Sequence, residues 1–150
     1  MPIEYRHLVA EPTDLAGDSF ALVAVAQAAH GFDRPRFFAT VARVLQPGGL
    51  LALWCYSLLE VAPALDAAVR ELHDVTLAPD WPPSRALVME GYRSIELPFP
   101  EVTLPPFAIE QSMTLAGVVG YLKTWSAIQQ QRRRTGADPL TALAPRLIAA

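Results

Sequence analysis

The chain has 150 residues, enough for one domain that buries roughly two-thirds of its unfolded surface. Its formal net charge of −3 gives no electrostatic reason to expect nucleic acid or an anionic membrane as a partner. The single cysteine, Cys55, lies in an apolar run, so we expect a buried thiol in the cytoplasm and no disulfide. Polar residues interrupt the longest apolar tracts, Phe20–Ala29 and Leu50–Ala68, so neither predicts a membrane span.

Apolar side chains make up 52% of the chain and charged ones only 18%, below the usual share of about 25%. This balance predicts more apolar surface than one chain of this size buries, and therefore a homodimer. Seven of the 14 prolines fall between Pro79 and Pro106, which excludes a long helix or a central strand from that stretch.

The first part of the chain predicts strands around one helix. Ile3–Val9 alternates apolar and polar residues, which favours a short strand. Phe20–Ala26 is almost wholly apolar, which is typical of a strand covered on both faces. A helix follows, with Asp33 as its N-cap and Pro35 in its first turn.

Pro47-Gly48-Gly49 ends that helix in a tight turn, because proline cannot continue a helix and glycine accepts left-handed geometry. It precedes a strand, so we interpret it as a structural turn and not as a phosphate cradle. Leu50–Tyr56 is the second predicted buried strand. Strand, helix and strand form a right-handed crossover, so the two strands should be parallel neighbours in an α/β fold.

The rest of the chain gives weaker patterns. The expected elements are a helix over Leu58–Leu77, strands at Ser94–Leu97 and Phe107–Met113, a helix from Ser112 or Thr114 to about Gln131, and a weaker helix over Pro139–Ala150. The basic run Arg132–Arg134 suits a helix C-terminus and solvent better than nucleic acid. His7 and His73 have no partner at metal-ligand spacing, so no metal site is predicted.

Four short motifs and their order resemble class I S-adenosylmethionine-dependent methyltransferases. They are Ala10-Glu11, Asp18–Val23, Gln27–Asp33 and Leu45–Gly49. Further along, Tyr92–Ile95, Pro98–Pro100 and Tyr121–Ser126 are similar to the substrate-side segments of the trans-aconitate methyltransferase-like branch. The resemblance covers nearly the whole chain.

This resemblance implies a partial Rossmann-like fold with parallel central strands and flanking helices. Residues 1–77 would form part of the Rossmann core, and residues 78–150 the substrate-side segment. The family begins with a strand and a Gly-x-Gly loop that approaches the cofactor, whereas the eight glycines here form no Gly-x-Gly. Ala21 and Gly31 stand where the family usually has Asp and Trp. We therefore expect a chain that lacks the glycine-loop segment and the last strand.

The resemblance also implies residue roles. His30 is the candidate catalytic residue, with capping of a neighbouring backbone group as the alternative. Ala10, Glu11 and Gln27 would border the cofactor, S-adenosylmethionine, although a solvated loop is the slightly preferred interpretation of the first two. The candidate substrate-binding residues are aromatic, and core packing is their alternative role: Trp54, Tyr56, Tyr121 and Trp125.

Two functions stay open at this point. One is a methyltransferase-like protein that acts on a small molecule, incomplete and weakly active or inactive as this chain. The other is a non-catalytic module that self-associates or binds a small molecule. The missing Gly-x-Gly loop favours the second, and the family resemblance favours the first.

Overall fold

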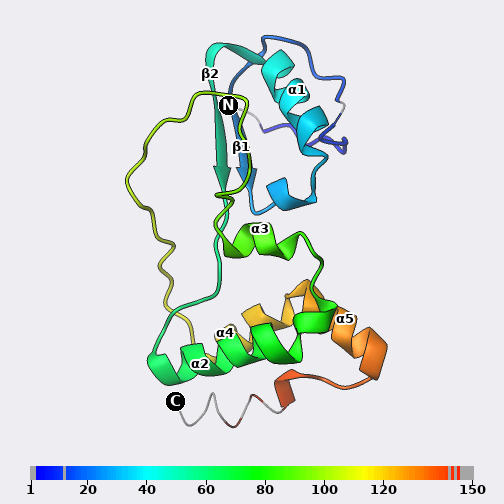
Figure 1. Ribbon diagram of the computed structural model, residues 1–150, viewed down its shortest axis with the longest axis vertical. Coiled ribbons are helices and arrows are strands. Elements are labelled where there is room, and N and C mark those ends of the chain that lie inside the picture. The colour runs from blue at the N-terminus through cyan, green and yellow to red at the C-terminus, as the bar shows by residue number, and fades with distance from the viewer. Residues whose placement is uncertain (1–2, 12, 142, 144, 146–150) are drawn as a thin grey trace. The chain divides into compact units, whose positions relative to one another are not determined.

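The computed structural model describes residues 3–11, 13–141, 143 and 145, and they form a mixed α/β structure (Figure 1). The chain divides into two compact units, each built from two stretches of sequence. The first contains Met1–Ser57 and Ser84–Val102, and the second contains Leu58–Pro83 and Thr103–Ala150. Residues 58–77, expected to join the strands in one core, thus fall in the second unit, while residues 84–102 fall in the first.

The first unit contains the predicted parallel strands. β1 spans Phe20–Ala26 and β2 spans Leu45–Trp54, and the two are hydrogen-bonded in parallel with Val25 opposite Leu53. They lie side by side in Figure 1, next to α1. The predicted strand–helix–strand unit is therefore confirmed.

α1 spans Arg34–Val44 and begins where the sequence predicts. The Asp33 side chain accepts a hydrogen bond from the Arg36 N–H, and Pro35 occupies the first turn. Phe37, Phe38 and Val41 on its inner face pack into one cluster with Val25 of β1. α1 therefore covers one face of the two strands.

The opposite face of the strands is exposed, which corrects the prediction that both faces are covered. Val23 and Leu51 point into the core cluster, whereas their neighbours Leu22 and Leu50 are 54% and 59% exposed. The reason is the period-two alternation of a strand combined with helical cover on one side only. The strand predicted at Ile3–Val9 does not form, and its apolar side chains are exposed.

The glycine turn is merged into β2, which is assigned from Leu45 and not from Leu50. Its register shifts at this point, since Phe20 pairs with Leu45 but Leu22 with Leu50. A Cβ on Gly49 would lie 2.9 Å from the Gln46 carbonyl oxygen, so only glycine fits there. The motif is thus structural, as predicted.

A short 3-10 helix, η1 (Ala29–Gly31), follows β1, and α3 (Arg85–Met89) contacts it. The segment after α3 is a turn and coil, so the predicted strand at Ser94–Leu97 is wrong. Ile95 instead buries its side chain in the core of the first unit, together with Val88 and Tyr92.

The second unit is helical. Its helices are α2 (Pro63–Glu71), continued by the π-helix η2 (Leu72–Thr76), the 3-10 helix η3 (Ala78–Asp80), α4 (Leu115–Lys123) and α5 (Ser126–Thr135). A cluster that includes Val69, Leu77, Leu122 and Ile128 joins them, and all four of these side chains are fully buried.

Several boundaries differ from prediction. α2 starts at Pro63 and not at Leu58, because Ala62 before the proline is extended and Asp66 Oδ1 accepts from the Val61 and Ala62 N–H groups. Residues 107–113 form no strand, and α4 is capped by Thr114. The single helix expected to reach Gln131 is divided in two at Trp125. The last predicted helix starts at Leu140 and Thr141, and most of its remainder lies outside the described residues.

Candidate functional site

The carboxyl ends of β1 and β2 lie at the same edge, where open α/β sheets bind ligands. Gln27 follows β1, and its side chain joins the two ends. Its Nε2 donates to the Tyr56 carbonyl oxygen at 3.0 Å, and its Oε1 accepts from the Tyr56 N–H at 2.9 Å. The Gln27 amide is therefore engaged within the protein, and its clearest role is to hold the strand ends together.

His30 lies on η1, immediately after this junction. Its Nδ1 is 3.0 Å from the hydroxyl oxygen of Tyr92. Tyr92 follows the end of α3, two residues after the C-cap Glu90. Tyr92 is buried, and its backbone has φ +61°, while Gln27 has φ +54°. Left-handed backbone at non-glycine residues is strained and concentrates at functional sites.

Burial sets the protonation of this cluster. It lowers the pKa of His30, with a further lowering from the cation of Arg85. Burial raises the pKa of Cys55 against the opposing effect of Arg85. Burial also raises the pKa of Tyr92, with an additional contribution from Cys55. At neutral pH the strand ends thus carry uncharged imidazole, thiol and phenol groups close to one arginine.

Ala10 and Glu11 lie in the same unit. Ala10 packs against its core, and Glu11 Oε1 accepts a hydrogen bond from the Asp33 N–H at 2.8 Å. The second oxygen, Oε2, is shielded from solvent and has no hydrogen-bond partner among the described residues. A buried acceptor without a donor is costly, so this oxygen fits a ligand N–H group.

The four candidate aromatic residues are not alike. Trp54 and Tyr56 are 45% and 44% exposed at the end of β2 and just beyond it. Tyr121 and Trp125 belong to the second unit, where the Trp125 ring packs 5.6 Å from Trp81 between centroids and is buried. In that unit these two rings contribute to the core, the alternative role given above.

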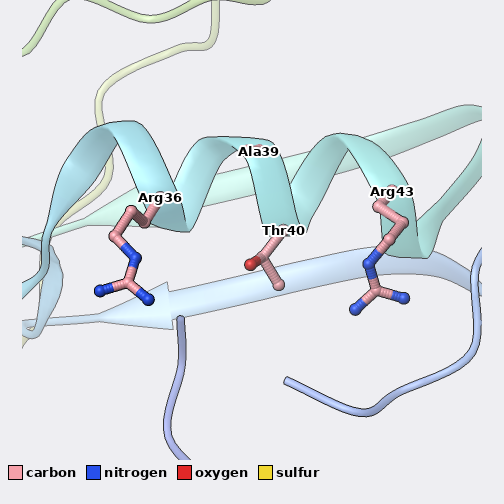
Figure 2. A pocket seen from close by; sticks show the side chains of 4 residues that line it. All are labelled: Arg36, Ala39, Thr40 and Arg43. Atoms are coloured by element: carbon pink, nitrogen blue, oxygen red, sulfur yellow. The ribbon is translucent and has the colours of Figure 1, made fainter. Parts of the chain in front are cut away.

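A hollow of about 300 Å³ lies along the side of α1 from which Arg36, Thr40 and Arg43 project (Figure 2). Arg36, Ala39, Thr40 and Arg43 line it, and none of them is a predicted site residue. Arg43 is engaged there, since it donates to the carbonyl oxygens of Thr13 and Leu15. The hollow therefore lies where Arg43 of α1 binds the loop that precedes β1.

The basic run at the end of α5 is also engaged. Arg134 makes a two-fold hydrogen-bonded ion pair with Asp80, and Arg132 pairs with Asp138. Over the part of the chain that the structure describes, no group of three His, Cys, Asp or Glu side chains is placed to hold a metal ion. Within the same residues, no helix has the length and apolar character of a membrane span.

Sequence reasoning missed Arg85 and Cys55 as members of the cluster, and it named Tyr92 only within a family-like segment. Tyr92 is 62 residues from His30 in the sequence, and no local pattern connects them. The available signal was the predicted crossover itself, because it places Cys55 beside Gln27 at the strand ends.

Known proteins resemble this chain over most of its length. Residues 1–53 match the methyltransferase domain family. A protein of Dictyostelium discoideum named as a methyltransferase is 35% identical over 127 residues, which are 83% of this chain and 48% of that protein. A solved structure named as a type II methyltransferase from Anaeromyxobacter dehalogenans is 47% identical, with a TM-score of 0.82 over 93% of this chain and 60% of that one. The chain thus spans about half of the length of the first relative and 60% of the second.

Proposed function

Because the chain belongs to the class I S-adenosylmethionine-dependent methyltransferases, we propose that it takes part in methyl transfer to a small molecule, with His30 at the transfer site. The observation that carries this proposal is the position of the His30–Tyr92 pair at the carboxyl ends of two parallel strands. Methyl transfer depends mainly on positioning, which a buried and uncharged cluster provides. The cytoplasm is the proposed location.

The cofactor part of the proposal rests on Ala10 and Glu11. S-adenosylmethionine, when bound, supplies the activated methyl group. The unpartnered Glu11 Oε2 fits a donor such as the exocyclic amine of an adenine. Gln27 contributes indirectly, since its amide already binds Tyr56. With no Gly-x-Gly in its 150 residues, we propose that this chain alone binds the cofactor weakly and is weakly active or inactive.

For the substrate we propose a small polar molecule, most simply a carboxylic acid of the kind that the trans-aconitate methyltransferase-like branch suggests. Arg85 supports this choice, because it is close enough to lower the pKa of His30. Trp54 and Tyr56 at the end of β2 offer exposed rings for its apolar part.

Titration of the ¹⁵N-labelled chain with S-adenosylhomocysteine, followed by NMR and calorimetry, tests the site. We expect a dissociation constant well above the micromolar range and resonance changes at Ala10, Glu11 and His30. Glu11→Gln should weaken binding, whereas the exposed control Glu110→Gln should not. Resonance changes confined to residues 115–135 would contradict the site, and low-micromolar affinity would contradict the weak binding.

A second candidate function is a self-associating, non-catalytic module. The uncovered face of the two strands favours it, because the side chains of Leu22, Leu50 and Trp54 are 45–59% exposed there. Contiguous apolar surface of this kind is typical of interaction sites. We propose a homodimer formed through this face, which is compatible with either function.

A further inference from the structure

The hydrogen bond between His30 and Tyr92 has a direction that follows from its surroundings. The Tyr92 hydroxyl oxygen is 3.0 Å from His30 Nδ1, and the nearby backbone of Ala29 and His30 acts to lower the pKa of Tyr92. Backbone groups that favour the phenolate form turn the positive N–H side of their dipoles toward the oxygen, so the oxygen and not the hydroxyl hydrogen faces them.

The phenol nevertheless keeps its proton at neutral pH. Burial and the neighbouring Cys55 raise the pKa of Tyr92, and they outweigh the backbone donors. A neutral phenol is a stronger hydrogen-bond donor than a neutral imidazole N–H, and an imidazole nitrogen is a stronger acceptor than a phenol oxygen. The hydroxyl of Tyr92 therefore donates to Nδ1 of His30. Nδ1 must then carry a lone pair.

The imidazole itself is neutral. Burial lowers the pKa of His30, and the cation of Arg85 lowers it further. Arg85 and Tyr92 are the charged and titratable groups shown to act on the ring, and Cys55 acts on Tyr92. A neutral imidazole carries one hydrogen, and if Nδ1 has none, that hydrogen lies on Nε2.

We infer that Tyr92 is a positioning residue that holds His30 as the neutral Nε2–H tautomer, so that His30 donates a hydrogen bond to its ligand and does not accept a proton from it. The ligand part of this inference rests on the proposed function. It identifies the ligand atom as an acceptor, such as a carboxylate or carbonyl oxygen. The α3 turn, with its left-handed Tyr92, would therefore set the chemistry of a residue 62 positions earlier.

The tautomer can be measured on the unliganded chain. Labelling histidine with ¹⁵N and recording ring correlations should show an unprotonated, hydrogen-bonded Nδ1 and a protonated Nε2 for His30 at pH 7. Tyr92→Phe should remove the hydrogen bond to Nδ1 and raise the pKa of His30 by about 0.5 to 1, because that bond stabilises only the neutral ring. The exposed control Tyr5→Phe should change neither.

A protonated Nδ1 in the unsubstituted chain would overturn the inference, and this result needs no variant to fold. An unchanged His30 pKa in a folded Tyr92→Phe variant would overturn it as well. Adding succinate and S-adenosylhomocysteine tests the ligand part, with a shift of the Nε2 resonance expected. If the tautomer is as inferred but neither compound moves Nε2, the proposed function fails while the role of Tyr92 in fixing the tautomer stands.

Discussion

Replacing Gln27 with alanine removes the two side-chain hydrogen bonds that join the ends of β1 and β2. Each such bond contributes about 0.5–1.5 kcal/mol net to stability. Both lie in an exposed region, so the lower half of that range applies, and we expect Gln27→Ala to cost about 1–2 kcal/mol. The loss is local, because it frees the Tyr56 backbone and not the core.

Glycine at the same position separates the hydrogen bonds from the backbone strain. Gln27 has φ +54°, a conformation that costs an alanine about 1–2 kcal/mol and a glycine almost nothing. The greater freedom of glycine in the unfolded chain offsets about 0.4–1 kcal/mol of this gain. At the midpoints of these ranges, Gln27→Gly should therefore be more stable than Gln27→Ala by about 0.8 kcal/mol, the reverse of the usual order.

Hydrogen exchange of the Tyr56 amide measures the local effect, and urea unfolding measures the total. In Gln27→Ala the Tyr56 amide should exchange about 5–30-fold faster, and the exposed control Gln111→Ala should leave it unchanged. Unaltered exchange at Tyr56 would refute the bridging role. An alanine variant as stable as the glycine variant would refute the argument from backbone strain.

Three further outcomes are expected. Light scattering coupled to size-exclusion chromatography should give the mass of a dimer, whose interface we expect to exceed about 2,000 Å² in total. Leu22→Glu should make the chain monomeric and the control Val102→Glu should not. A monomeric unsubstituted chain would contradict the homodimer. The hydrogen bond from Arg134 lowers the pKa of Asp80, so the stabilisation by this ion pair is complete above about pH 4 and is lost as the pH falls through the lowered pKa. Asp80→Asn should lower the Tm at pH 7 and make the Tm depend less on pH in the acid range. An acid dependence of the Tm equal to that of the unsubstituted chain would contradict this role of Asp80. Because burial raises the pKa of Cys55, a thiol reagent at pH 8 should modify it more slowly than a free cysteine, and equal rates would show an exposed thiolate.

Local signals predicted the strand–helix–strand unit correctly. The apolar run of β1, the Asp33 cap and the glycines after α1 each act within a few residues, so the sequence shows them directly. Patterns that require a distant partner misled the prediction. Ile3–Val9 and Phe107–Met113 have strand-like alternation, but no neighbouring strand pairs with them in the described structure.

The site was predictable only in part. The position of Gln27 and His30 follows from the crossover, because parallel strands end at one edge. The role of the Gln27 amide and the pairing of His30 with Tyr92 depend on contacts across 29 and 62 residues. Such contacts produce no periodic pattern in the sequence. The break at Trp125 is similar, since the ring leaves the helical path to pack against Trp81.

The division of the chain into two discontinuous units affects its synthesis on the ribosome. β1, α1 and β2 are complete once Ser57 has been made, yet their core also needs Val88, Tyr92 and Ile95. The 45 residues from Ser57 to Val102 take about 2–9 s to translate. During that interval Phe38 and Val41 of α1 lack part of the core against which they pack in the folded unit. Until Val102 has been made, the nascent chain therefore exposes apolar surface that the folded first unit buries, and Leu58–Pro83 of the second unit is made in the same interval.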